Sequence, residues 1–167
     1  MSNLVALQVG RLAAVGIIGD DGEGYELTKA LTRMGVDIRH LIRSKDRFTP
    51  TYTKPMLQLP GGEEEMNRQD IKNRTRLPED LESEIMEHIK EAVADADGVI
   101  IVDQVQERNC GVVTDRVREL LAELADANRE KIFFADSRVR IGEFRRVMVK
   151  PNRYETAAAV GIEENPT

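Results

Sequence analysis

The stretch Val147-Met-Val-Lys-Pro-Asn-Arg-Tyr-Glu155 decides the fold class, because it joins a short apolar strand to a helix through a tight turn. Pro151 cannot donate to a strand ladder, and Asn152 is of a residue type that frequently caps the N-terminus of a helix. The pattern predicts a strand that ends at Lys150 and a helix that begins near Arg153. Strands that alternate with helices in this way are typical of α/β proteins with a parallel sheet.

The same alternation extends through the rest of the chain. Compact apolar runs predict buried strands, and segments with apolar residues three or four positions apart predict helices. Near-continuous apolar strands joined by helices imply a mostly parallel sheet with helices on both faces. The predicted strands are residues 13–18, 98–102 and 132–135, and the predicted helices are residues 23–34, 78–94 and 114–128.

The 167 residues are interpreted as one domain in which two segments interrupt the core. Extended residues with alternating apolar positions predict a small β lid over about 36–60. Residues of about 60–77 contain Gly61-Gly62 and the acidic run Glu63–Glu65, and they predict a mobile loop or flap. The core then consists of residues 1–35 and 78–167.

The composition limits the possible functions. A net charge of −6 disfavours a nucleic-acid-binding protein, and no apolar run reaches the ~18–20 residues that cross a bilayer, so we expect a cytoplasmic protein with no membrane contact. The single cysteine, Cys110, excludes an internal disulfide and is expected to pack rather than to react, while His40 and His88 are too isolated for a metal site. One basic cluster is either a solvated face or a surface for a small anionic ligand. Its members are Arg138, Arg140, Arg145 and Arg146.

Polar residues end the predicted buried strands, namely Asp103, Asp136 and Lys150. Ligands of open parallel sheets bind at the carboxyl ends of the strands, so we expect these side chains to face one crevice. Aspartate and asparagine are also common turn and cap residues, and each residue taken alone is explained by that local role. The set of three favours a ligand site.

Asn152 begins the last predicted helix, whose amide groups and positive dipole end favour a phosphate. Glu155, three residues further on, either returns to Asn152 in a capping box or holds a magnesium ion through water. Asp21 presents a similar choice. It either caps the helix at 23–34 or binds a cation together with Asp20, and capping is the preferred interpretation.

Five motifs carry a resemblance to a known family. Lys150–Glu155 resembles the Thr/Lys-Pro-Asn-x-x-Glu segment of the ribokinase-like, or PfkB, carbohydrate kinases. Asn3–Leu12 is similar to the family's Asn-containing helix, and Val15–Gly24 resembles its Val-Gly-x-x-Gly-Asp-Asp-x-x-Gly strand and turn. Pro50–Lys54 resembles its lid strand, above all in the heptose-kinase branch. Asp136–Arg140 is similar to an Asp-x-Asn-x-Arg pattern, with an arginine at the Asn position.

The resemblance implies a ribokinase-like α/β fold with a β lid, and a kinase that uses ATP and Mg²⁺ to phosphorylate a sugar. It implies substrate contacts for Asn3, Lys54 and Asp103, although Lys54 is also explained as an exposed strand lysine. It implies phosphate and cofactor contacts for Asp136, Arg140, Lys150, Asn152 and Glu155, with Glu155 also at the metal.

The family's catalytic Gly-Ala-Gly-Asp segment has no counterpart in the 167 residues, so we interpret the chain as a partial domain with little or no kinase activity alone. The lid or exposed sheet edges favour a homodimer or a larger assembly. Two alternatives stay open. One is a non-catalytic module for sugar or nucleotide binding or for dimerisation on the same scaffold, and the other is a general α/β nucleotide-binding protein. The sugar itself is undetermined between heptose and ribose types.

Overall fold

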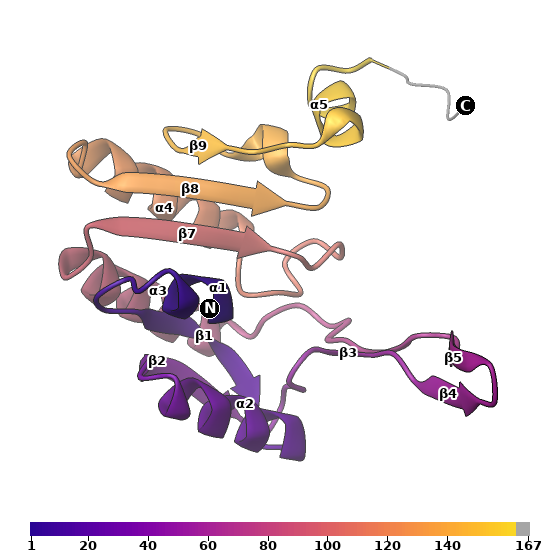
Figure 1. Ribbon diagram of the computed structural model, residues 1–167. Helices are drawn as coiled ribbons and strands as arrows, with labels where there is room; N and C mark the ends of the chain where they lie inside the picture. Colours follow the sequence, from indigo (N-terminus) through magenta and orange to yellow (C-terminus); the bar gives the residue numbers. More distant parts are fainter. Residues whose placement is uncertain (163–167) are drawn as a thin grey trace. The chain divides into compact units, whose positions relative to one another are not determined.

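A computed structural model describes residues 1–162, and its elements are drawn in Figure 1. The chain divides into two compact units, Met1–Arg74 and Thr75–Thr167. The elements of the first unit are α1 (Ser2–Ala6), β1 (Ala13–Gly19), α2 (Gly22–Arg33), β2 (Asp37–Ser44), β3 (Thr51–Thr53), β4 (Met56–Leu59), β5 (Gly62–Glu65) and β6 (Gln69–Ile71).

The first unit is built on the parallel pair β1–β2, with α2 as the crossover between the strands. Ala14, Leu31 and Val36 are buried together at its centre, which confirms the predicted strand at 13–18 and the predicted helix at 23–34. The turn after α2 requires a glycine, because Gly35 has a φ of 73°, in the left-handed region.

Asp21 fixes the start of α2. Its Oδ1 accepts hydrogen bonds from the Gly24 amide (2.7 Å) and from the Thr49 hydroxyl (2.7 Å), and its Oδ2 accepts from the Thr49 amide (2.8 Å). A side chain at Gly24 would clash with the carbonyl oxygen of Gly19, so the glycine permits this close approach. The predicted capping role of Asp21 is confirmed, and Asp20 instead pairs with Arg43 at 3.4 Å.

We expect Asp21→Ala to lower the free energy of unfolding by about 1–2 kcal/mol, because the substitution removes the helix cap and releases Thr49. Asp20→Ala is the matched control. It loses only the exposed pair with Arg43, which contributes about 0–1 kcal/mol. Urea unfolding followed by circular dichroism measures both variants, and equal losses would contradict the assignment of the cap to Asp21.

The lid differs from its predicted bounds. Residues 37–44, assigned to the lid from sequence, form β2 of the parallel pair, because His40, Ile42 and Ser44 alternate inward and are buried. The predicted loop at about 60–77 contains β5 and β6, which pair antiparallel with β4 and β3. These strands carry few apolar residues, so pairing and not local propensity defines them. β5 forms a hairpin with β4 across Pro60-Gly61, and β6 pairs with the more distant β3.

The second unit contains the longer helices. Its elements are α3 (Glu79–Ala94), β7 (Gly98–Asp103), α4 (Asp115–Ala127), β8 (Ile132–Ser137), η1 (Ile141–Glu143), β9 (Met148–Val149) and α5 (Arg153–Ala159). Strands β7, β8 and β9 form one parallel sheet in that order, with α4 behind the strands in Figure 1. The strands predicted at 98–102, 132–135 and 147–149 and the helices predicted at 78–94 and 114–128 are confirmed within a few residues.

The two faces of this sheet differ in burial. Ile101, Phe133 and Ala135 lie on one face and are buried, as are Ile85 of α3 and Val117 of α4. The opposite face carries apolar side chains that remain exposed: Ile100 is 58% exposed, Val102 57% and Ile132 58%.

Candidate functional site

The predicted site residues divide between the two units. Asn3 is exposed on α1, and Lys54 is exposed beyond β3, where its ammonium group pairs with Glu65 of β5 at 3.0 Å. These two residues belong to the first unit. The other predicted residues, from Asp103 to Glu155, belong to the second unit.

The parallel register brings the strand ends of the second unit to one edge of the sheet. Asp103, the last residue of β7, lies opposite Ser137 of β8, and Val102 lies opposite Asp136. On the other side of β8, the amide of Lys150 donates to the Ala135 carbonyl at 3.2 Å. Asp103, Asp136 and Lys150 therefore end at the same carboxyl edge, as their positions in the sequence predicted.

Asp103 points into the protein at this edge and is 4% exposed. Its Oδ2 accepts a hydrogen bond from the Ser137 hydroxyl at 2.8 Å and lies 3.8 Å from Nε of Arg140. Burial raises the pKa of Asp103 above its ordinary value, against the opposing effects of the Ser137 hydrogen bond and of the Arg140 and Arg118 charges. Direct contact between Asp103 and a substrate stays a prediction.

Arg140 is buried beside Asp103. Its two terminal nitrogens donate to the carbonyl oxygens of Gln106 (2.8 Å) and Val105 (2.6 Å), in the loop that follows β7. Contact with the cofactor, which the sequence motif implied for Arg140, also stays a prediction, because these bonds go to the protein itself.

An outer polar row follows the same edge. Nε of Arg138 donates to Oε1 of Gln104 at 2.8 Å, and the Gln104 amide nitrogen lies 3.4 Å from Oδ2 of Asp136. Arg138 is exposed, while Gln104 and Asp136 are half-buried. The sequence interpretation missed Gln104, although its position directly after the strand end Asp103 is a usable signal.

Asn152 and Glu155 form a capping box at the start of α5. The Asn152 side chain accepts from the Glu155 amide (2.9 Å), and Glu155 Oε2 accepts from the Asn152 amide (2.7 Å). Residues 1–162 contain no group of three or more acidic, histidine or cysteine side chains placed to hold a metal. A magnesium ion at Glu155 would thus depend mainly on phosphate oxygens and water, as this ion usually does.

The basic cluster predicted from sequence does not form one surface. Arg140 is buried, Arg145 pairs with Glu119 at 3.0 Å, and Arg146 lies 4.0 Å from Asp126. Only Arg138 of the four lies in the outer row at the carboxyl edge. The cluster therefore does not provide a common anion site, because most of its charge is directed at partners within the chain.

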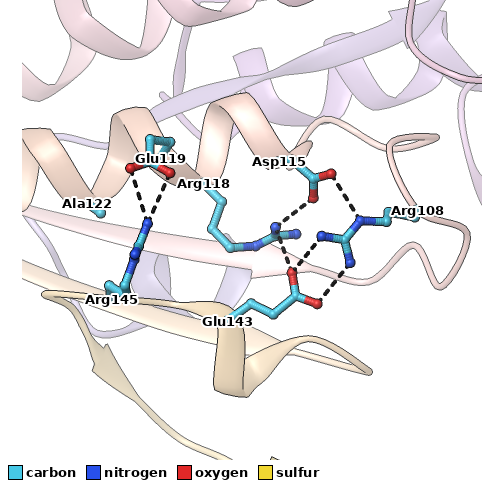
Figure 2. A pocket seen from close by; sticks show the side chains of 7 residues that line it. All are labelled: Arg108, Asp115, Arg118, Glu119, Ala122, Glu143 and Arg145. Atoms are coloured by element: carbon cyan, nitrogen blue, oxygen red, sulfur yellow. Dashed lines mark hydrogen bonds and ion pairs between the residues drawn. The ribbon is translucent and has the colours of Figure 1, made fainter.

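A pocket of about 170 Å³ lies beside the N-terminus of α4 and is lined by charged side chains. Figure 2 shows that Arg108 and Arg118 share two carboxylates, Asp115 and Glu143. Arg118 is buried and its guanidinium lies 5.4 Å from the centre of the Phe144 ring. The pocket lining contains as many acidic as basic side chains, so the arrangement joins η1 to α4 rather than attracting an ion of one sign. The lining residues are Arg108, Asp115, Arg118, Glu119, Ala122, Glu143 and Arg145.

The ion pairs of this pocket make the stability of the chain sensitive to acid. Burial alone would raise the pKa of Asp115, but hydrogen bonds from Asn109, Arg118 and Arg108 outweigh burial and lower the pKa from 3.8 to about 2. A folded pKa below the unfolded one means that the stabilisation is complete above about pH 5 and is lost as the pH falls from about 4 to 2.

We expect the melting temperature to fall between about pH 5 and pH 2, and Asp115→Asn to show a smaller fall, because the variant has no carboxylate to protonate there. Asp97→Asn, at an exposed position before β7, is the matched control. Thermal melts followed by circular dichroism measure all three proteins. Parallel profiles for the wild type and Asp115→Asn would contradict the assignment.

Comparison with known proteins gives sequence relatives and structural neighbours. No protein-family model matches the chain. The chain is 28% identical over 166 residues to the bifunctional protein HldE of Wolinella succinogenes, and 24% identical over 163 residues to that of Helicobacter pylori strain G27. These alignments cover 99% and 97% of this chain but 33% of each relative. The chain thus spans about a third of the length of the curated relatives that it matches.

Solved structures agree on the fold. The chain superposes on the crystal structure of Sa239 with a TM-score of 0.66 at 17% identity, covering 97% of this chain and 50% of that one. For a candidate sugar kinase from Clostridium perfringens the TM-score is 0.59 at 18% identity, with 98% and 49% covered. For a PfkB protein from Polaromonas it is 0.52 at 14% identity, with 84% and 44% covered. The chain has a ribokinase-like α/β fold, and it spans about half of each of these structures. The resemblance carried by the sequence motifs is confirmed.

Proposed function

We propose that the chain is part of a PfkB-type carbohydrate kinase, which transfers a phosphoryl group from ATP to a sugar hydroxyl with the help of Mg²⁺. One observation carries the proposal: the strand ends Asp103, Asp136 and Lys150 lie at one carboxyl edge of a parallel sheet in a ribokinase-like fold. Ligands of such sheets bind at this edge. The next four residues after Lys150 and Pro151 add the capped helix start that the kinase motif uses.

Phosphoryl transfer depends chiefly on positioning and on stabilisation of negative charge. Lys150 is exposed at the strand end, where its ammonium group suits a phosphate oxygen. The capping box fixes the first turn of α5 and places Glu155 beside it. A bound magnesium ion would neutralise phosphate charge, with Glu155 as the protein group that we assign to it. Asp136 and Arg140 complete the proposed cofactor side, although Arg140 acts from inside the protein.

The proposed substrate is a sugar. Asn3, Lys54 and Asp103 are its proposed contacts, and Lys54 would exchange its exposed pair with Glu65 for a sugar hydroxyl. The similarity to HldE proteins over nearly the whole chain fits the heptose-kinase branch. We place the protein in the cytoplasm, where ATP is available. Among the described residues no helix has the length and apolar character to span a membrane.

The competing proposal is a non-catalytic module that binds a sugar or nucleotide on the same scaffold. It is favoured by the lack of a Gly-Ala-Gly-Asp segment in these 167 residues, because that segment supplies the catalytic base in the family that the chain resembles. Both proposals expect the chain to bind a sugar or a nucleotide, but only the kinase proposal expects phosphoryl transfer. For the 167 residues alone we therefore expect binding without substantial phosphoryl transfer.

Titration calorimetry with magnesium-ATP and with ribose, fructose and a manno-heptose tests the proposal. We expect saturable binding of one sugar and of the nucleotide, and a coupled ADP-release assay that stays near background. Lys150→Ala should weaken nucleotide binding about tenfold, because it removes one charge-assisted contact. Lys90→Ala, on the exposed face of α3, is the control. Binding of neither ligand would contradict the kinase scaffold, and turnover at ordinary kinase rates would contradict the expected inactivity.

We also propose a homodimer or a larger assembly. Exposed apolar residues of the lid, such as Met56 and Leu57 of β4, support an interface there. The exposed face of β7 is the competing surface. Sedimentation measurements on two variants separate them. We expect Leu57→Glu to shift the chain to monomer, because a buried charge opposes association, and Ile100→Thr to leave the assembly intact. If Ile100→Thr and not Leu57→Glu gives a monomer, the interface lies on the exposed face of β7. A monomeric wild type would contradict the proposal.

A further inference from the structure

The loop that follows β7, residues 104–106, is attached to the protein by Arg140. This arginine is 8% exposed, and its terminal nitrogens donate to the carbonyl oxygens of Gln106 at 2.8 Å and of Val105 at 2.6 Å. The two bonds go to successive carbonyls from one planar guanidinium group, so they set the direction of the loop as well as its distance from β8.

Arg140 is itself anchored in the buried end of the sheet. Its amide donates to the Ser137 hydroxyl at 3.1 Å, and that hydroxyl donates to Asp103 Oδ2 at 2.8 Å. The same carboxylate oxygen lies 3.8 Å from Nε of Arg140. The amide of Arg138 donates to the Asp103 carbonyl at 3.1 Å, which ties the turn after β8 to the end of β7. A buried charge with several partners holds one geometry, because each alternative would leave a charge unpaired.

The outer side of the same edge carries the groups that a ligand can reach. Gln104 lies between a positive and a negative side chain, since it accepts from Arg138 at 2.8 Å and its amide nitrogen lies 3.4 Å from Asp136. Together they offer an amide that donates and accepts, a carboxylate that accepts and a guanidinium that donates. Each hydroxyl group of a sugar donates and accepts hydrogen bonds, so this combination of donors and acceptors matches adjacent sugar hydroxyls.

We propose that Gln104 is a further sugar-contacting residue, at the centre of a row with Asp136 and Arg138, and that Arg140 is the residue that positions it. The ligand class is a polyhydroxyl compound whose neighbouring hydroxyls replace the hydrogen bonds within the row. The proposal rests on the proposed sugar-binding function of this edge. It adds to the sugar contacts already proposed: Arg140 supports the row from inside the protein, and Gln104 is the added contact.

Hydrogen exchange and sugar titration on the full 167-residue chain test the two parts separately. Arg140→Met keeps the length of the side chain and removes its donors. We expect amide exchange in residues 104–107 to rise about tenfold or more, while exchange in the centre of β8 stays near the wild type. Sugar affinity should fall about tenfold. Gln104→Ala should reduce sugar affinity to a similar extent without changing exchange. Gln106→Ala, an exposed side chain in the same loop, should change neither.

Uniformly faster exchange across the unit in Arg140→Met would overturn the positioning role, because it would show a general loss of stability. Unchanged exchange with strongly reduced nucleotide binding would show a direct contact instead. If Arg140→Met does not fold, Arg140→Lys decides, with an intermediate exchange rate expected from its single ammonium group. If the wild type binds none of ribose, fructose and manno-heptose, the proposed function and the contact by Gln104 are both wrong. The positioning role of Arg140 is then tested by hydrogen exchange alone.

Discussion

The parallel register between β7 and β8 is the constraint on which the second unit depends. It sets Asp103 opposite Ser137 and Val102 opposite Asp136. The first pair is buried, while Val102 is exposed and Asp136 is half-buried. Because side chains alternate along a strand, a shift of β8 by one residue against β7 would turn Asp136 inward and Ser137 outward. Asp103 would then stay buried without the hydrogen bond from Ser137.

The sequence predicted those elements whose own apolar period marks the face that they bury. The helix α3 repeats apolar residues toward the core, and Ile85, Ile89 and Val93 are buried in it as that pattern requires. The caps at Asp21 and Asn152 were also predictable, since both depend on contacts within a few residues. The strand β6 was not, because its pairing with β3 closes a loop that no local pattern encodes. The polar strand β5 was also missed, although the two-residue turn Pro60-Gly61 that joins it to β4 is a hairpin signal.

The candidate site was predictable in place but not in orientation. Sequence position identified Asp103 and Asp136 as strand-end residues, and the register places both at the same edge. Which of the two side chains points inward depends on the packing of the sheet against α4, and the sequence motifs do not specify that packing. Arg140 illustrates the same limit, because a motif match predicts contact with a cofactor while the side chain binds the carbonyls of Val105 and Gln106.

Charge pairing within the chain then restricts where an anionic ligand can bind. The pocket beside α4 contains as many carboxylates as arginines, and Asp115 and Glu143 each pair with both Arg108 and Arg118. An incoming phosphate would have to displace one of these carboxylates from its two arginines. Hydrogen bonds from Asn109, Arg118 and Arg108 outweigh burial and lower the pKa of Asp115 to about 2, so its carboxylate is already charged and paired near neutral pH. At the carboxyl edge Lys150 is exposed, and no comparable network surrounds it among the described residues. Electrostatic cost therefore favours this edge over the pocket, even though three arginines line the pocket.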